Sequence, residues 1–408
     1  MAVKERPRIL LIKPTLPYPP DMGTKLLSFN LIRALQERFD VTVLARVLSA
    51  GETPYADELS KHCRRVVTVF APNKQSVFHK VFYKALYNLK NLLMKRSMKS
   101  SYDCPGVFLK AARKLAAEHF DYHVVEYWQL WRMAEVLPLD RTVLLSHDVE
   151  MLVNRQNALM ERNLFLKIRA VRRWLYEQRE EIRAYRTFRR ILALTERDRT
   201  AIQAIAGEKT PVEVLPFGLD PGDYPDLGIK RNPREVLFVG VMTASFNRDA
   251  LQFFIRRIYP NLHHLEGLKI TIVGGRLPRE LAYLQQAEGV EITGKVLDVR
   301  PYLARAACLV IPLQFGGGLR TRVLEAMFAG LPVVCTSVAM AGMPFEPEMD
   351  YLLADSPEEF GRQIGRLLGS PGLPGKISNS AKEKVLKLYS RSAQAARLES
   401  LFQGFINT

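Results

Sequence analysis

Cysteine and long apolar runs are both scarce in this sequence. Four cysteines occur among 408 residues, with no CxxC pair and no metal-ligand spacing. This excludes a disulfide-stapled scaffold and a zinc site, and we expect buried free thiols in a reducing compartment. The longest clean apolar runs, such as Ile9–Ile12 and Ala307–Leu313, are far shorter than the roughly 18 residues that span a bilayer. We therefore expect no transmembrane span, no secretory signal and a cytoplasmic protein.

Acidic residues are outnumbered by basic ones. The chain has 59 Lys and Arg against 42 Asp and Glu, a formal net charge of +17. Residues 231–408 hold 21 basic and 16 acidic side chains, so most of the excess belongs to residues 1–230. The electrostatic field of this positive charge attracts polyanions, which include nucleic acid, anionic lipid head groups and phosphorylated substrates. Charge alone does not distinguish these partners.

The length and the spacing of short apolar runs predict two α/β domains. A chain of 408 residues exceeds the size at which one hydrophobic core stops growing. The predicted strands alternate with helix-length segments, which is typical of mostly parallel, doubly wound sheets. They lie at Ile9–Ile12, Val41–Ala45, Val66–Phe70, His123–Val125, Val143–Ser146, Ile191–Leu194 and Val212–Leu215 in the first half, and at Val236–Val239, Ile270–Val273, Val290–Thr293, Leu309–Ile311 and Val333–Cys335 in the second.

A stretch dense in proline and glycine, residues 215–225, is the best candidate for a linker. We therefore expect a Rossmann-like domain at residues 1–218 and a second one at residues 219–385. Residues 386–408 are expected to form a C-terminal helix that packs back on the first domain.

Two basic segments interrupt the alternation of strands and helices. Residues 76–100 hold six basic side chains and no acidic one, and residues 151–190 hold 11 Arg or Lys against four Glu. Both have apolar residues at helical spacing, so they are either solvated helices whose stripes face the core or helices that dock on an anionic membrane. In the second case residues 76–100 would attach the protein peripherally to the inner face of the membrane, beside a lipid-linked acceptor. The basic side chains of the first segment are Lys80, Lys84, Lys90, Lys95, Arg96 and Lys99.

The most informative stretch runs from Pro312 to Val334. Gly316, Gly317 and Gly318 follow a predicted buried strand and allow a ligand to approach the backbone closely. The predicted helix after them offers free N–H groups to a phosphate. Two arginines at the start of that helix, Arg320 and Arg322, can add charge-assisted hydrogen bonds to the same anion.

With this stretch the sequence resembles the retaining glycosyltransferases of family 4, the group 1 transferases with the GT-B architecture. The resemblance is most specific at Gly316–Val334 and extends to Pro17–Gly23, Leu215–Asp220 and Phe238–Gly240. It implies two Rossmann-like domains facing across a cleft. The second would hold a nucleotide-sugar donor, such as a UDP- or GDP-sugar, and the first a glycan or lipid-linked acceptor.

The resemblance also implies roles for residues of the glycine-rich stretch. Glu325 matches the second glutamate of the family's Glu-x7-Glu motif, which accepts hydrogen bonds from the ribose hydroxyls of the donor. The first glutamate is replaced by Gly317, so backbone amides of Gly316–Leu319 and the Arg320 side chain would take over part of the donor contacts. Arg320 and Arg322 are the expected diphosphate clamps and catalytic groups.

Further donor contacts are expected from two other loops. Gly240 follows a predicted strand, but the family's arginine after this glycine is replaced by Val241, so Arg248 is the remaining candidate cation. Gly23 resembles the family's close-approach glycine, which lets the first loop reach the donor phosphates. Each of these residues also has a plain structural interpretation, a turn glycine or a surface arginine.

Two polar residues follow predicted strands in the first half. His147 ends the stretch Leu144–His147, and open α/β sheets build their sites at the carboxyl ends of strands. Similar family members carry a catalytic histidine there that touches the sugar of the donor. Glu126, at the end of another strand, is a candidate on the acceptor side.

The family resemblance implies retention of the anomeric configuration, with the β-phosphate of the donor taking the proton of the acceptor. The protein would then act by stabilising charge on the leaving diphosphate. No Asp-x-Asp sequence occurs, so we expect no metal and no cofactor besides the nucleotide-sugar co-substrate.

Other classes of function are disfavoured by missing motifs. A nicotinamide-dependent oxidoreductase would show Gly-x-Gly-x-x-Gly after the first strand, which here is followed by a proline-rich loop. No motif for nucleic-acid binding accompanies the positive charge. We expect a hexosyltransferase of cell-envelope polysaccharide synthesis. Transfer to a soluble small molecule, or a nucleotide-binding pseudoenzyme suggested by Gly317 and Val241, remain the alternatives.

Overall fold

The computed structural model describes residues 6–71, 97–161, 163–242, 244–275, 277 and 279–406. The chain divides into two compact units. Unit 1 comprises Met1–Gly218, Gly317–Leu319 and Arg391–Thr408, and unit 2 comprises Leu219–Gly316 and Arg320–Ser390. Among the described helices, none is both long and apolar enough to cross a bilayer.

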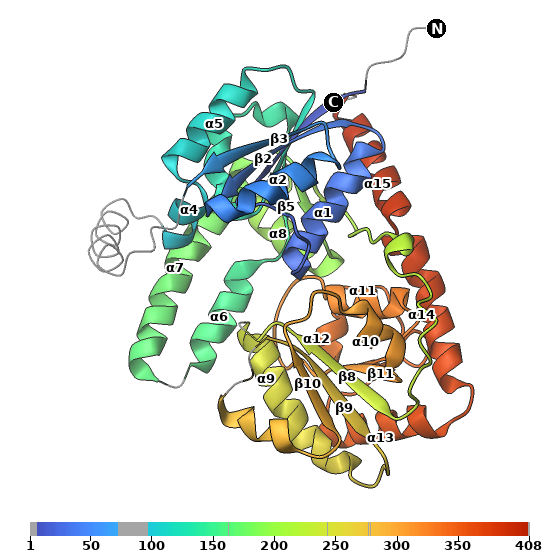
Figure 1. Cartoon of the computed structure of the whole chain (residues 1–408). Coiled ribbons are helices and arrows are strands. Elements are labelled where there is room, and N and C mark those ends of the chain that lie inside the picture. The colour runs from blue at the N-terminus through green and yellow to red at the C-terminus, as the bar shows by residue number, and fades with distance from the viewer. Residues whose placement is uncertain are drawn as a thin grey trace, which may run out of the picture. The chain divides into compact units, whose positions relative to one another are not determined.

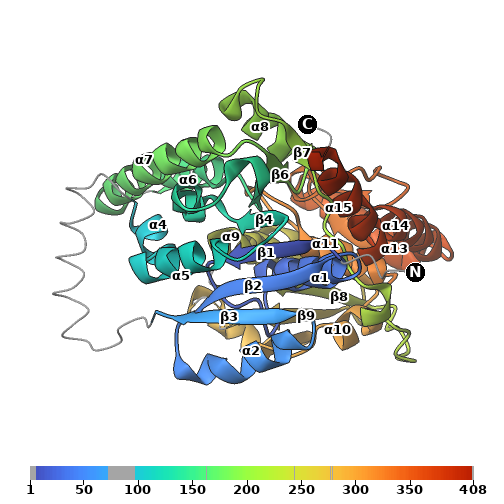
Figure 2. The ribbon, with the colours of Figure 1, turned by 90° about the horizontal axis from the view of Figure 1, so that it is seen from above.

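Unit 1 contains a seven-stranded sheet in the order β3-β2-β1-β4-β5-β6-β7, in which every neighbouring pair is parallel. Its central strands are apolar almost throughout, because helices cover both faces of such a sheet. Figure 2 shows β1, β2 and β3 side by side. The strands are β1 (Arg8–Lys13), β2 (Asp40–Val47), β3 (Arg65–Phe70), β4 (Tyr122–Glu126), β5 (Thr142–Ser146), β6 (Ile191–Ala193) and β7 (Val212–Val214).

Some helices of unit 1 begin at a side chain that caps the first turn. Asn163 accepts a hydrogen bond from the Leu166 N–H at the start of α7, and Thr195 accepts one from the Asp198 N–H at the start of α8. The α-helices are α1 (Gly23–Gln36), α2 (Thr53–Ser60), α4 (Met98–Asp103), α5 (Gly106–Ala116), α6 (Glu150–Met160), α7 (Leu164–Thr187), α8 (Glu196–Ala206) and α15 (Arg391–Ile406), with 3-10 helices at Ala50–Glu52, Trp128–Glu135 and Leu139–Arg141.

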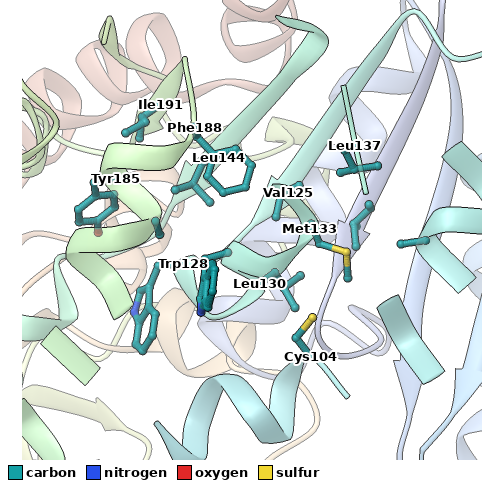
Figure 3. Close-up of a cluster of buried hydrophobic side chains, with 14 of the residues drawn as sticks. Cys104, Val125, Trp128, Leu130, Met133, Leu137, Leu144, Tyr185, Phe188 and Ile191 are labelled. Carbon is teal, nitrogen blue, oxygen red and sulfur yellow. The ribbon is translucent and has the colours of Figure 1, made fainter. Parts of the chain in front are cut away.

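The core of unit 1 includes an aromatic cluster beside β4 and β5. Figure 3 shows Val125, Trp128, Leu130 and Tyr185 as members of one buried cluster. Trp128 is only 1% exposed. Burial of this ring fixes the 3-10 helix that directly follows the polar end of β4.

Helix α15 returns to unit 1 after the chain has built unit 2. It lies beside α1, as Figure 1 shows, and Phe402 packs against Phe39 and Tyr122 at ring-centroid distances of 5.4 and 4.7 Å. Just before α15, the Leu219 N–H donates to the Tyr389 carbonyl oxygen at 2.7 Å. The two ends of unit 2 are therefore joined.

Unit 2 contains a six-stranded parallel sheet in the order β10-β9-β8-β11-β12-β13. Its strands are β8 (Glu235–Gly240), β9 (Lys269–Gly274), β10 (Val290–Gly294), β11 (Cys308–Ile311), β12 (Val333–Cys335) and β13 (Leu352–Leu353). Its α-helices are α9 (Ser245–Phe253), α10 (Arg300–Arg305), α11 (Thr321–Phe328), α12 (Ser337–Met340), α13 (Pro357–Gly369) and α14 (Leu373–Tyr389), with a π-helix at Phe254–Ile258 and 3-10 helices at Pro221–Asp223, Tyr259–Leu262 and Arg279–Gln286.

The predicted fold class is confirmed, because both units have parallel sheets that are wound in two directions from a first strand. Each predicted strand coincides with an observed one. Among the strands in the described residues, only the two-residue β13 was not predicted from the apolar runs. Of the predicted basic helix at residues 76–100, residues 76–96 lie outside the described residues. Lys99 lies in α4 and forms an ion pair with Glu150.

Candidate functional site

Each sheet has one point at which the strand order reverses: the first strands are added toward one edge of the sheet and the later strands toward the other edge. In unit 1 this point lies between β1 and β4, and in unit 2 between β8 and β11. Ligands of open α/β sheets bind beyond the carboxyl ends of the strands at such points. Lys13 ends β1 and Glu126 ends β4, so the reversal point of unit 1 carries a cation and a carboxylate.

Lys13 and Glu126 form a buried ion pair. The Lys13 Nζ lies 3.3 Å from the Glu126 Oε2, and the two residues are 1% and 0% exposed. Ser28, which projects from α1, donates from its Oγ to the same Glu126 oxygen and accepts from the Lys13 Nζ. The charges compensate each other where a single buried charge would be very costly.

His147 joins this pair from the next strand, since it directly follows β5. Its Nε2 donates to the Glu126 Oε2 at 2.9 Å. The Tyr127 ring stacks on the His147 ring, with centroids 4.1 Å apart, and the Lys13 Nζ lies 4.7 Å from the centroid of Tyr127. Tyr127 adopts φ 75, a conformation that non-glycine residues rarely take, which turns its ring over this cluster. We call Lys13, Ser28, Glu126, Tyr127 and His147 the strand-end cluster.

Burial and charge shift the pKa values in the strand-end cluster. Burial alone would raise the pKa of Glu126, but the charge of Lys13 and the hydrogen bond from His147 oppose it and hold this pKa at about 2. Burial lowers the pKa of His147, against the opposing effect of Glu126. Burial likewise lowers the pKa of Lys13. At neutral pH the cluster therefore holds an ionised Glu126 and a neutral imidazole.

Two buried acceptor atoms of the cluster find no hydrogen-bond partner within the described part of the chain. They are the Glu126 Oε1 and the His147 Nδ1. Because the Nε2 carries the proton that is donated to Glu126, the Nδ1 carries a lone pair. Buried polar groups normally have partners, so unpartnered acceptors at a reversal point suit a ligand that brings hydroxyl groups.

The sequence identified His147 and Glu126 but missed the other members of the strand-end cluster. Lys13 could have been found by the same signal, because it also ends a buried strand. Ser28 and Tyr127 gave no such signal, since one lies within the apolar stripe of a helix and the other reaches the cluster through its unusual backbone. Gly23, the other candidate of this unit, is the first residue of α1.

At the reversal point of unit 2, Gly240 ends β8 in register with Gly274 of β9. A Cβ on Gly274 would lie 2.1 Å from the Gly240 carbonyl oxygen, so the two backbones touch. The Arg248 side chain donates from its Nη1 to the Met242 carbonyl oxygen at 3.2 Å, which ties the start of α9 to the loop after β8.

The glycine-rich loop follows β11 on the other side of the same reversal point. Gly316 and Gly318 have φ values of 133 and 72, which favour glycine. A Cβ on Gly316 would lie 2.4 Å from the Arg320 Nη2, so the guanidinium covers this turn. It also lies 5.3 Å from the centroid of the Phe246 ring, in the first turn of α9. Arg320 thus connects the glycine-rich loop after β11 with the start of the helix that follows β8.

Glu325 is buried inside α11 and is fixed by two side chains. The Arg322 Nη1 donates to both of its carboxylate oxygens, at 2.9 and 2.7 Å, and the Tyr224 hydroxyl donates to its Oε1 at 3.2 Å. Burial and the Glu325 charge raise the pKa of Tyr224 well above its usual value. Arg322 therefore serves as the partner of Glu325 in this structure.

The sequence missed Tyr224, which lies in the linker stretch. Gly317 and Leu319, the other two donor-site candidates of the glycine-rich loop, are partly buried.

Metal-ligating residues are not clustered in the described ranges: no group of three or more His, Cys, Asp or Glu is placed there to hold a metal ion. All four cysteines are buried free thiols.

Comparisons with known proteins agree with this architecture. Residues 233–370 match the family model described as Glycosyl transferases group 1. This segment includes the reversal point of unit 2, the glycine-rich loop and Glu325. A sequence comparison with curated proteins gives no match.

Several solved structures resemble the whole chain in fold. Sucrose-phosphate synthase from Thermosynechococcus elongatus has a TM-score of 0.69 at 16% identity, over 98% of this chain and 100% of that chain. TarM has a TM-score of 0.68 at 13% identity, over 98% and 99%. HepE from Anabaena, solved with UDP-glucose, has a TM-score of 0.65 at 14% identity, over 97% and 99%.

The chain therefore has the GT-B fold of two Rossmann-like units, and residues 233–370 of its second half resemble the group 1 glycosyltransferases. The predicted resemblance to group 1 transferases is confirmed, although these matches do not separate family 4 from the other families of this group.

Proposed function

We propose that this protein is a retaining, metal-independent hexosyltransferase that transfers a sugar from a UDP- or GDP-sugar to a glycan or lipid-linked acceptor in cell-envelope polysaccharide synthesis. The observation that carries the proposal is the arrangement at the reversal point of unit 2. There a glycine-rich loop, the Arg320 guanidinium and a fixed Glu325 carboxylate surround the start of one helix. UDP is favoured as the nucleotide, because HepE was solved with UDP and with UDP-glucose.

In the proposed donor complex, loop N–H groups and Arg320 bind the diphosphate, and Glu325 accepts hydrogen bonds from the ribose hydroxyls. Gly240 lets the nucleotide approach β8, and Arg248 adds positive charge. The strand-end cluster binds sugar hydroxyls through the two unpartnered acceptors of Glu126 and His147.

The proposed reaction breaks the bond between the anomeric carbon and the β-phosphate oxygen. The acceptor oxygen bonds to that carbon on the same face, and its proton passes to the departing phosphate. Arg320 and the N–H groups at the start of α11 stabilise the negative charge of the leaving diphosphate, which is commonly the largest catalytic contribution.

Thermal unfolding with UDP, GDP, ADP and CMP, each with and without magnesium, tests the donor assignment. A ligand at a hundredfold excess over its Kd stabilises the folded state by about 2.7 kcal/mol. We expect UDP to raise the unfolding temperature equally in both conditions. No shift with any nucleotide, or a shift that requires magnesium, contradicts the proposal.

The Glu325→Gln variant tests the site itself. Loss of a charge-assisted hydrogen bond should weaken UDP binding about tenfold or more in calorimetry. Glu358→Gln, at an exposed position in the first turn of α13, is the matched control. Equal affinities of the two variants would show that the ribose does not contact Glu325.

A nucleotide-binding pseudoenzyme is the second candidate, because Gly317 stands where the family has a glutamate. It predicts a UDP shift without sugar transfer or donor hydrolysis. Product analysis by NMR separates the two, because only an active enzyme forms a product, and the anomeric configuration of that product tests the proposed retention. Transfer to a soluble small molecule is distinguished by supplying soluble acceptors in that assay.

A further inference from the structure

The turn between α6 and α7 exposes a group of large apolar side chains. Leu164 and Phe165 are 73% and 74% exposed, and Ile168 is 61% exposed. Leu159 and Met160, at the end of α6, are 58% and 53% exposed. We call Leu159, Met160, Leu164, Phe165, Leu166 and Ile168 the hairpin-tip patch. Isolated exposed apolar residues are ordinary, but a contiguous group of this size marks an interaction surface.

The apolar stripe of α7 continues this patch along the helix. Leu164, Ile168 and Leu175 recur at helical spacing, and Leu175 is still 49% exposed. In a surface helix such a stripe normally faces the core. Here the buried positions of α7 lie farther along, at Glu177, Glu180 and Glu181 among others, so the stripe at residues 164–175 is left outside the core.

The base of this helical hairpin is firmly attached to unit 1. The Glu181 carboxylate accepts the N–H groups of Glu150 and Met151, at 2.8 and 2.7 Å, and so caps the start of α6. Glu180 accepts a hydrogen bond from the Ser100 hydroxyl at 2.6 Å. Figures 1 and 2 show α6 and α7 side by side. The hairpin-tip patch is therefore presented on an anchored arm.

Basic side chains surround the patch. Arg155, Arg169 and Arg172 are exposed, and Lys167 is half-buried between the apolar positions of α7. The neighbouring acid, Glu161, accepts a hydrogen bond from the Asn163 N–H at the turn. Apolar anchors combined with a basic rim fit an anionic lipid interface, where basic residues add attraction to the burial of apolar area.

We propose that the hairpin-tip patch and its basic rim form a docking surface for anionic lipid membranes. The apolar side chains enter the boundary between head groups and acyl chains, and Arg155, Lys167, Arg169 and Arg172 contact lipid phosphates. The proposal goes beyond the proposed transfer reaction and does not depend on the donor chemistry, so its failure would leave the nucleotide-binding result unchanged.

Co-sedimentation of the whole chain with phosphatidylcholine vesicles, with and without 30% phosphatidylglycerol, tests the docking surface. We expect binding to the anionic vesicles and about tenfold or greater weakening in Leu164→Glu/Phe165→Glu. Leu297→Glu is the control, because Leu297 is 101% exposed in unit 2 and lies outside the patch. Circular dichroism melting checks that all variants are folded.

The basic rim is tested by Lys167→Gln/Arg169→Gln/Arg172→Gln. This variant should lose most of its affinity for anionic vesicles, and binding of the parent should weaken steeply with salt. The proposal is overturned by binding that survives both multiple substitutions, by equal binding to neutral vesicles, or by no binding of the parent. It is also overturned if the parent is a dimer without lipid and Leu164→Glu/Phe165→Glu makes it monomeric, since a second copy would then cover the patch.

Discussion

Three charged or titratable side chains occupy the ends of three neighbouring strands of unit 1, and each depends on the others. Lys13 keeps Glu126 ionised, and Glu126 fixes the proton of His147 on the Nε2. Without its partners, any one of these groups would be a buried polar atom with a large desolvation cost. The chemistry offered to a ligand, two acceptors and no exposed charge, is therefore a property of the cluster.

The mutual dependence of Lys13 and Glu126 can be measured as a coupling free energy. Lys13→Met leaves a buried carboxylate without its cation and should destabilise unit 1 by about 3–5 kcal/mol. Lys13→Met/Glu126→Gln removes both charges and should cost less than the two single changes together. Urea unfolding followed by tryptophan fluorescence reports on unit 1, because Trp128, Trp131 and Trp174 all lie there. Additive costs would mean that the pair is not coupled.

His147 should titrate below the usual pKa of histidine, near 6.5, because burial disfavours the imidazolium form. In the unfolded chain His147 is protonated as the pH falls through about 6.5, whereas in the folded chain it is protonated only at a lower pH. Acidification below pH 6.5 therefore favours the unfolded chain and destabilises the fold. Proton NMR titration, with the His147 signal assigned by its absence in His147→Gln, measures this pKa. A value at or above 6.5 would contradict the neutral imidazole.

At the scale of single elements, the contact between β8 and β9 leaves no room for a side chain at Gly274, whereas the next residue, Gly275, has open space. Gly274→Ala would place a Cβ 2.1 Å from the Gly240 carbonyl oxygen, so the strands must separate. We expect a loss of about 2–3 kcal/mol in the stability of unit 2. Gly275→Ala is the control, since its Cβ meets no atom within 4 Å.

Calorimetry follows this change in unit 2, whereas the tryptophan transition of unit 1 should stay in place. If Gly275→Ala destabilises as much as Gly274→Ala, then close packing of the two strand ends is not the cause.

The sequence predicted the elements well and the site only in part. Short apolar runs mark the strands because parallel strands are buried on both faces, and a polar residue after such a run marks a carboxyl end, which identified Glu126 and His147. The pairing of Arg322 with Glu325 is a contact three residues apart on one helix, a spacing that the sequence contains. The position of Ser28 against Glu126 depends on how α1 packs on the sheet, which no local pattern contains.

At the scale of the whole chain, α15 completes unit 1. Phe402 is 1% exposed between Phe39 and Tyr122. Phe402→Ala should therefore lower the stability of unit 1 by about 3–5 kcal/mol and move the tryptophan transition to lower urea. Arg397→Ala in the same helix removes a surface ion pair with Glu213 and should cost less than about 1 kcal/mol. An unchanged transition in Phe402→Ala would show that unit 1 is stable without this contact.

The late position of α15 in the chain also affects how the protein is made. A ribosome adds roughly 5–20 residues per second, so it needs on the order of ten seconds to translate unit 2 after the last strand of unit 1. During this interval the nascent unit 1 has its complete sheet but lacks the helix that covers Phe39 and Tyr122. Unit 1 is therefore translated first, but it cannot be completed until α15, the last helix of the chain that the structure describes, has been made.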